Sequence, residues 1–261
     1  YLQRHQYDNA ETADLWDALE ASTKQPVRAL MNTWIFQPGY PLISVTREDR
    51  SLMLAQQIFR YAQDGADRER NWHVPIFLRV GTSNGIESRT LLLTEHQRHI
   101  EFSSDIHWAV VNAGGHGFYR VRYGSELGSA LQSQLRTVLT PVERFSLVND
   151  GWATTLAGMT ALTEYLDLIE LLRDEDDLNV WTTVIGSCHQ LARIVEDDQR
   201  AALERRVGAV CLAAGGGWGW GGVPGGGGVG RSVVGGVLRA RGAGGAGKRG
   251  LHRGDREATT G

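Results

Sequence analysis

Apolar residues recur every three or four positions in the first part of the chain, up to about residue 36. This spacing predicts two amphipathic helices, because residues three and four apart lie on one face of a helix. Thr12 is the predicted N-cap of the first helix, and Pro26 is the predicted first residue of the second. The predicted apolar stripes are Leu15, Trp16 and Leu19, then Val27, Leu30, Met31 and Trp34. The run QPGYP at 37–41 then predicts the end of helical structure, since Pro38 disfavours helix in the residue before it.

The hydrophobic period changes to two after residue 41, which is typical of half-buried strands. In WHVPIFLRV, for example, every second residue from Val74 to Val80 is apolar. The predicted strands are 42–47, 52–57, 74–80, 87–93, 99–102, 108–112 and 119–123. Short strands separated by Gly, Asn and Asp turns favour a small β-sandwich. Pro75 within a strand predicts a sheet edge or a bulge.

Three glycines lie close together in VNAGGHGFYRVRY, residues 111–123. A phosphate-binding glycine loop requires a helix after it, because the amide groups of the helix N-terminus bind the anion. Here an alternating run follows instead, and Gly114, Gly115 and Gly117 match neither phosphate-loop pattern. The segment is therefore predicted to be a turn that leads into a strand.

From residue 125 the spacing becomes helical again. Ser125 is the predicted cap of a helix that carries Leu127, Leu131, Leu135 and Leu139. The sequence TPVE at 140–143 is a capping box with Pro at the first helical position, so a second helix is predicted to begin there. Its predicted buried stripe is Val142, Phe145, Val148, Trp152 and Leu156, and Gly158 is its predicted end.

Two further helices are predicted, on either side of the acidic run 174–177. Their apolar residues are Leu162, Tyr165, Leu166, Ile169 and Leu172 in the first, and Val180, Val184, Cys188, Leu191 and Val195 in the second. Short connections make neighbouring helices antiparallel, so paired helices stacked as an all-α helical-repeat (HEAT-like) domain are expected.

The last 54 residues, 208–261, differ in composition from the rest. They hold 21 of the 33 glycines and 7 Lys or Arg against 2 Asp or Glu, which leaves the first 207 residues acidic. The segment contains no Ile, Phe, Tyr, Met, Asn or Gln, so it is not expected to bury a core. Three explanations are open: a frameshift in a GC-rich gene near Val207, a natural flexible tail, or an arginine–glycine segment that binds RNA.

Cysteine content, hydropathy and charge exclude several classes of protein. Cys188 and Cys211 are too few for a disulfide framework, which indicates a reducing compartment. No run of about 18 apolar residues occurs and no secretory signal opens the chain, so a cytoplasmic protein without membrane contact is expected. The acidic body argues against nucleic acid as a partner.

Candidate catalytic and metal-binding residues are few. The zinc motif H-E-x-x-H is absent, and its nearest counterpart is EHQRH, in which His96 and His99 follow Glu95 in a strand-rich region. Three residues apart is a poor spacing for one face of a strand, so a metal site is not expected there. His73, His107 and His116 are scattered in sequence, Cys188 and His189 fall in a helical stripe, and Asp197 and Asp198 look like a solvated helix end. We therefore assign no catalytic, cofactor-binding or metal-binding residue.

Several blocks in order resemble the zinc aminopeptidase family that includes aminopeptidase N, puromycin-sensitive aminopeptidase and the endoplasmic-reticulum aminopeptidases. They are YLQRHQYDNAETADLWDALE at 1–20, VRALMNTWIFQPGYPLISV at 27–45, WHVPIFL at 72–78, VNAGGHGFYRVRY at 111–123 and ERFSLVNDGWATTLAG at 143–158. The resemblance covers residues 1 to about 205 and implies the C-terminal portion only.

The resemblance implies a domain organisation. Residues 1–40 would be the last helices of a thermolysin-like catalytic domain, 41–123 the β-sandwich, 124–207 the start of the helical domain, and 208–261 the disordered or frameshifted tail. In the family a zinc ion activates water for attack on the first peptide bond of a peptide, and a glutamate acts as the base. Those residues would lie upstream of Tyr1, so this chain is expected to bind no zinc.

We therefore interpret the chain as a broken piece of an aminopeptidase, inactive by itself. A truncated helical repeat leaves an apolar face uncovered, which predicts partial disorder or aggregation after about Asp197. The alternative is a non-catalytic module in which a β-sandwich and a helical solenoid bind peptides or proteins.

Overall fold

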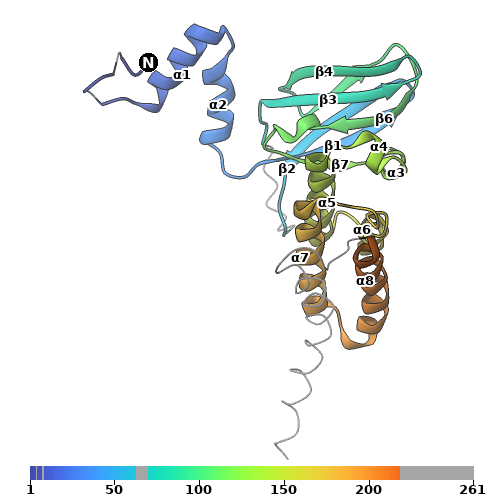
Figure 1. Cartoon of the computed structure of the whole chain (residues 1–261). Coiled ribbons are helices and arrows are strands. Elements are labelled where there is room, and N and C mark those ends of the chain that lie inside the picture. Colours follow the sequence, from blue (N-terminus) through green and yellow to red (C-terminus); the bar gives the residue numbers. More distant parts are fainter. Residues whose placement is uncertain (4, 8, 63–69, 218–261) are drawn as a thin grey trace, which may run out of the picture. The chain divides into compact units, whose positions relative to one another are not determined.

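The computed structural model describes residues 1–261 except 4, 8, 63–69 and 218–261. The predictions for the glycine-rich tail therefore lie outside the described residues beyond Gly217. The chain divides into two compact units, Tyr1–Leu168 and Ile169–Gly261. Figure 1 shows helices and strands in the first unit and helices in the described part of the second. Among the described residues, no helix is both long and apolar enough to cross a membrane.

The two N-terminal helices begin slightly away from the predicted residues. Helix α1 spans Thr12–Thr23 and α2 spans Val27–Ile35. The N-cap of α1 is Glu11 rather than Thr12, because Glu11 and Asp14 form a reciprocal capping box. Pro26 is the N-cap of α2 rather than its first helical residue. The predicted stop is confirmed, since α2 ends directly before Phe36 and QPGYP.

Seven strands form two sheets, close to the predicted spans. The strands are β1 (Pro41–Glu48), β2 (Ser51–Ile58), β3 (Val74–Thr82), β4 (Gly85–Leu93), β5 (Gln97–Glu101), β6 (Ile106–Val111) and β7 (Arg120–Tyr123). One sheet has the order β5-β2-β1-β7 and the other the order β4-β3-β6. All neighbours are antiparallel except β1 and β7, which are parallel in the register Ile43 to Val121.

Both sheets contribute to one buried apolar cluster. The predicted alternation in β3 is confirmed, because Val74, Ile76, Leu78 and Val80 are all buried. Pro75 pairs with Leu92 of β4 but lies outside the β6 pairing, so β3 tolerates its missing amide hydrogen there. The irregularity in the β3–β6 register falls at Gly81, where an added Cβ would overlap the Trp108 indole.

The glycine cluster is a turn, as predicted. Gly114 and Gly115 have φ angles of 77° and 71°, a region that favours glycine. They belong to the short 3₁₀ turn Ala113–Gly115, and Asn112 closes the loop by bonding both the amide and the carbonyl of Gly117. The element that follows this turn is the strand β7. It is not a helix, so no helix N-terminus is placed there to bind phosphate.

The segment predicted as one helix after residue 125 is divided. It forms α3 (Ser125–Gln132) and the single turn α4 (Leu135–Val138), with Gly124 rather than Ser125 as the N-cap of α3. α5 spans Pro141–Leu156 and has the predicted capping box of Thr140 and Glu143. Gly158, with a φ of 70°, lies just beyond its end as predicted.

Helices α6 (Leu162–Glu170), α7 (Leu178–Ile194) and α8 (Asp197–Gly217) complete the described chain. The Asp177 carboxylate accepts hydrogen bonds from two amides of the first turn of α7, so the acidic run caps this helix. Within the second unit, Arg206 of α8 pairs with Glu170 at 2.6 Å. The described residues after Asp197, for which partial disorder or aggregation was predicted, are helical to Gly217 and bury Leu203, Val207 and Val210, so they differ from the predicted disorder. The alternative of aggregation stays a prediction.

Candidate functional site

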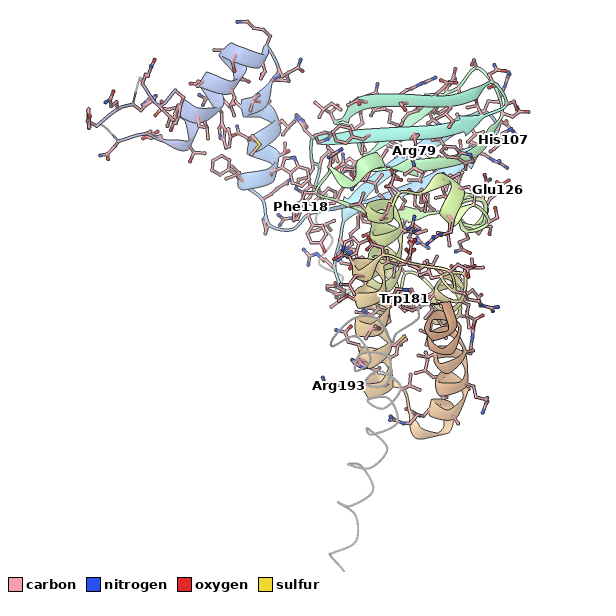
Figure 2. All side chains as sticks on the ribbon, in the orientation of Figure 1. Arg79, His107, Phe118, Glu126, Trp181 and Arg193 are labelled. Atoms are coloured by element: carbon pink, nitrogen blue, oxygen red, sulfur yellow. The ribbon has the colours of Figure 1, made fainter. Side chains whose placement is uncertain are left out.

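The histidines named from the sequence lie on β5, β6, α7 and the connections between strands. His99 lies on β5, and its Nδ1 is 3.4 Å from the Glu48 carboxylate. His107 Nε2 lies 3.1 Å from Ser83 Oγ on the exposed side of β6 (Figure 2). Among the residues that the structure describes, no three His, Cys, Asp or Glu side chains are grouped closely enough to hold a metal ion. Cys188 is buried in α7, and His189 beside it is exposed.

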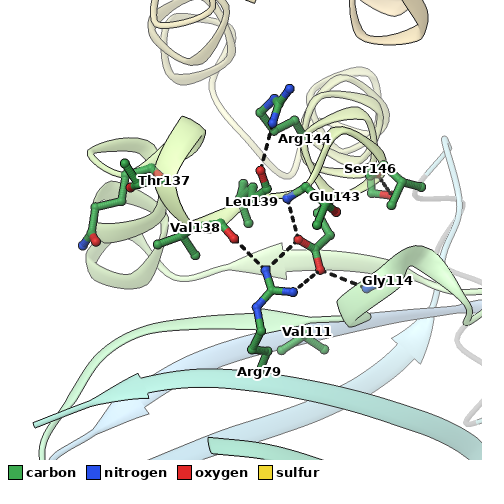
Figure 3. A network of polar contacts seen from close by, with 12 residues as sticks. Arg79, Val111, Gly114, Thr137, Val138, Leu139, Glu143, Arg144 and Ser146 are labelled. Carbon is green, nitrogen blue, oxygen red and sulfur yellow. Dashed lines mark hydrogen bonds and ion pairs between the residues drawn. The ribbon is translucent and has the colours of Figure 1, made fainter. Parts of the chain in front are cut away.

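The most developed polar site joins α5 to the sheets through Arg79 of β3 and Glu143 of α5. Arg79 donates hydrogen bonds of 2.9 and 2.7 Å to the two carboxylate oxygens of Glu143, and a third of 2.6 Å to the Val138 carbonyl (Figure 3). Glu143 also accepts from the amides of Gly114 and Thr140. One carboxylate thus binds a strand, a turn and a helix N-terminus.

This arrangement decides the protonation state of Glu143. Burial alone would raise its pKa, but the hydrogen bonds from Arg79 and the two amides outweigh burial, so the pKa of Glu143 is lowered. The side chain is therefore an anion at neutral pH and accepts hydrogen bonds with both oxygens. A carboxylate held in this way is a structural anchor rather than a proton donor.

A second buried pair lies farther along α5. Arg120 of β7 donates to Asp150 at 2.9 Å and to the Tyr40 hydroxyl at 3.1 Å, and its guanidinium lies 5.0 Å from the centre of the Phe59 ring. Asp150 also accepts from the Val121 amide at 2.9 Å. The Asp150 carboxylate therefore accepts a hydrogen bond from an amide at the outer edge of β7, which a neighbouring strand could otherwise have bound.

Burial raises the pKa of Asp150 to about 6, because desolvation outweighs the opposing effects of the Val121 amide and of Arg120. Burial raises the pKa of both carboxylates of α5, but the net shift is downward for Glu143 and upward for Asp150. Glu143 has one more amide donor and a bidentate arginine, which compensates for its loss of water more completely.

The buried residues of α5 differ from the predicted apolar stripe. Val148 and Trp152 are buried as expected, but Val142 and Leu156 are exposed. Glu143, Arg144 and Asp150 are buried instead. Glu143 and Asp150 are seven residues apart and so share one helix face, which was the signal available in the sequence. This seven-residue spacing indicates buried carboxylates only once Arg79 and Arg120 are known to lie opposite them on the strands.

A groove of about 570 Å³ lies within the first unit, beside these ion pairs. Its lining includes hydroxyl side chains from β1, α3 and α5 and the acidic side chains of Glu164 and Asp167 on α6. Arg122 of β7 is the basic residue of the lining. A groove of this volume is large enough for a small ligand or a short peptide segment.

Comparison with known proteins relates the chain to aminopeptidases. Residues 108–220 match the family described as the ERAP1-like C-terminal domain. This match continues past Val207, the point at which family-like sequence was predicted to end. The chain is 35% identical over 217 residues to puromycin-sensitive aminopeptidase of Caenorhabditis elegans, which covers 79% of the chain and 23% of that protein.

Two other relatives give the same result. Aminopeptidase M1 of Arabidopsis thaliana is 32% identical over 214 residues, which covers 76% of the chain and 24% of the relative. Alanine/arginine aminopeptidase of Saccharomyces cerevisiae is 31% identical over 191 residues, which covers 73% of the chain and 22% of the relative. The chain thus spans about a quarter of the length of these relatives. It belongs to the family of puromycin-sensitive and M1 aminopeptidases and corresponds to a C-terminal portion of them.

Proposed function

We propose that this chain is the C-terminal portion of a zinc-dependent aminopeptidase that removes N-terminal residues from peptides in the cytoplasm. The observation that carries the proposal is the match of 79% of the chain to a protein named an aminopeptidase. In this proposal the two sheets form the β-sandwich domain, and the helices from α3 onward begin a HEAT-like helical domain. Peptides are the substrates of the whole enzyme.

The residues that the structure describes do not fit a zinc site. No three described metal-binding side chains converge. We therefore assign zinc, which would activate water for peptide-bond hydrolysis, to residues outside this chain. The role of the present residues is to hold α5 on the sheets through Glu143 and Asp150, and so to support the start of the helical domain.

The proposal is tested by a chimera. The matched 23% of the Caenorhabditis elegans relative is replaced by this chain, and hydrolysis of an aminoacyl anilide is measured. Hydrolysis that is abolished by a chelator and restored by zinc is expected. A folded chimera without such hydrolysis would contradict the proposal. The chain alone should hydrolyse the anilide no faster with zinc than without it, and clear turnover would refute the assignment of zinc to residues outside the chain.

A non-catalytic peptide-binding module is the second candidate, and the groove of about 570 Å³ favours it. The acidic residues Glu164 and Asp167 on its wall would suit a basic peptide. Isothermal titration of the chain with basic and acidic peptides of equal length tests this candidate. Preferential binding of the basic peptide, weakened by Glu164→Gln, would support it.

A further inference from the structure

Strand β4 lies at the edge of the three-stranded sheet, and its outer side has no strand beside it among the residues that the structure describes (Figure 1). It pairs with β3 without a break over the nine residues Gly85–Leu93. Edge strands of native proteins are commonly short or interrupted by a bulge, because an open edge presents a row of amide and carbonyl groups to which another strand can bind. A long, regular edge such as that of β4 is suited to the addition of a strand.

One hydrogen bond shows which backbone groups of β4 point outward. Arg98 donates to the Leu92 carbonyl at 3.1 Å, and Arg98 lies on β5, a strand of the other sheet. The Leu92 carbonyl therefore does not point toward β3. Backbone groups of an antiparallel strand alternate in direction with a period of two residues. Those of Ile86, Ser88 and Thr90 thus also point away from β3 and are placed to bind a further strand.

The side chains of this edge include an exposed apolar residue and an ion pair. Ile86 is 67% exposed although it is large and apolar. Arg89 and Glu87, whose side chains are 37% and 30% exposed, pair at 2.7 Å. The Arg89 guanidinium also donates to the Glu101 carbonyl at 2.7 Å and lies 4.1 Å from the centre of the Phe102 ring. Arg89 is thus held in position at the edge and retains further N–H donors for a second carboxylate.

The sequence of β4 is complementary to itself about Ser88. When two copies of the strand lie antiparallel across a two-fold axis at Ser88, each Arg89 faces Glu87 of the other copy. Opposite charges in directly facing positions stabilise a pair of strands. The exposed Ile86 then faces Thr90, which brings two β-branched side chains into contact across the axis. The outward amide and carbonyl of Ser88 bind those of its counterpart, as in a regular antiparallel ladder.

We infer that β4 binds β4 of a second copy of this chain, antiparallel and centred on Ser88, so that the two three-stranded sheets become continuous. A two-fold axis at Glu87 or Arg89 would instead place like charges opposite each other. The paired segment is 85–91, which ends directly before the carbonyl that Arg98 already binds. An interface of one strand is small, so a weak dimer is expected. The inference does not depend on the proposed function.

Sedimentation velocity of the full chain, at concentrations from about 10 μM to about 1 mM, tests the inference. The average mass should rise with concentration from that of a monomer toward that of a dimer. Ser88→Pro removes the amide at the centre of the pairing, and it should weaken dimerisation at least about tenfold. Because this amide points away from β3, the substitution leaves the β3–β4 ladder intact. A monomer throughout this range would overturn the inference.

Two charge reversals test the register of the pairing. Glu87→Arg or Arg89→Glu alone places like charges opposite each other across the axis, so each variant should dimerise at least about tenfold more weakly than the unchanged chain. An equimolar mixture of the two variants restores opposite charges at both positions, and a mixed dimer should form. Glu126→Arg, which reverses a charge of the exposed pair with Arg47, is the matched control and should dimerise like the unchanged chain.

The remaining outcomes are decisive as well. A dimer that survives Ser88→Pro and both charge reversals would use another surface, and the inference would be wrong. A mixture that is no more dimeric than either variant alone would exclude the register centred on Ser88. A monomer in which the amides of Ile86 and Thr90 are protected from hydrogen exchange would show that another segment of the same chain covers β4. Circular dichroism checks that each variant is folded, and if Ser88→Pro is not, the mixture of charge reversals decides alone.

Discussion

Replacement of Glu143 by Gln tests the view that α5 is anchored by a buried ion pair. The Glu143 side chain is 2% exposed and accepts four hydrogen bonds, two of them from Arg79. Loss of one partner of a buried pair costs about 3–5 kcal/mol, because the other charge loses its compensation. Arg79 retains the Val138 carbonyl and is about a quarter exposed, so we expect the lower value, about 3 kcal/mol.

The assay is native-state hydrogen exchange of amides in β3 at increasing urea concentration, which reports the opening free energy of the first unit. Glu126→Gln is the matched control, since Glu126 also pairs with an arginine, Arg47, but is 65% exposed. An exposed pair contributes about 0–1 kcal/mol, so the control should change little. If Glu143→Gln costs no more than Glu126→Gln, the buried pair does not anchor α5.

A double-mutant cycle isolates the pair from the cap. Glu143 also closes the capping box with Thr140, so its replacement weakens two features at once. Arg79→Met breaks the ion pair but leaves the cap. A coupling free energy of about 1–3 kcal/mol between the two substitutions is expected for residues in direct contact. Additive effects would assign the loss to the cap instead.

Three further predictions follow from local geometry and from the pKa of Asp150. Gly81→Ala should lower the free energy of unfolding by about 3 kcal/mol, since its Cβ would overlap Trp108, whereas Gly186→Ala on α7, with open space, should raise it by about 0.5–1 kcal/mol; urea denaturation measures both. Burial raises the folded pKa of Asp150 from 3.8 to about 6, so its contribution to stability is greatest at low pH and falls by about 3 kcal/mol as pH rises through this window. The difference in unfolding free energy between wild type and Asp150→Asn, measured at pH 4 and 7, should show this fall, and a difference independent of pH would contradict it. Carboxyl NMR should place the midpoint of Asp150 near pH 6.

Local sequence signals predicted most element positions. The alternation of Val74 to Val80 and the capping box at Thr140 depend on residues near one another in the chain, and both are confirmed. Single-residue errors at Thr12 and Pro26 arose because several neighbouring residues can cap a helix, and the choice depends on which pair of groups closes the hydrogen bonds.

The polar anchors of α5 could not be predicted in this way. Glu143 and Asp150 look like solvated positions in a helix until Arg79 and Arg120 are known to lie opposite them. Those arginines are 64 and 30 residues away in sequence. Whether a charged residue is buried therefore depended on a contact that no local pattern describes.

The sequence by itself located most of the helices and strands to within a few residues, and its ordered blocks identified the aminopeptidase family. Tertiary structure alone decided that β7 pairs in parallel with β1 and that α5 turns Glu143 and Asp150 toward arginines on the strands. The physical reason is that periodicity and caps act over a few residues of chain, whereas burial, ion pairing and sheet order are decided by residues that meet only after folding.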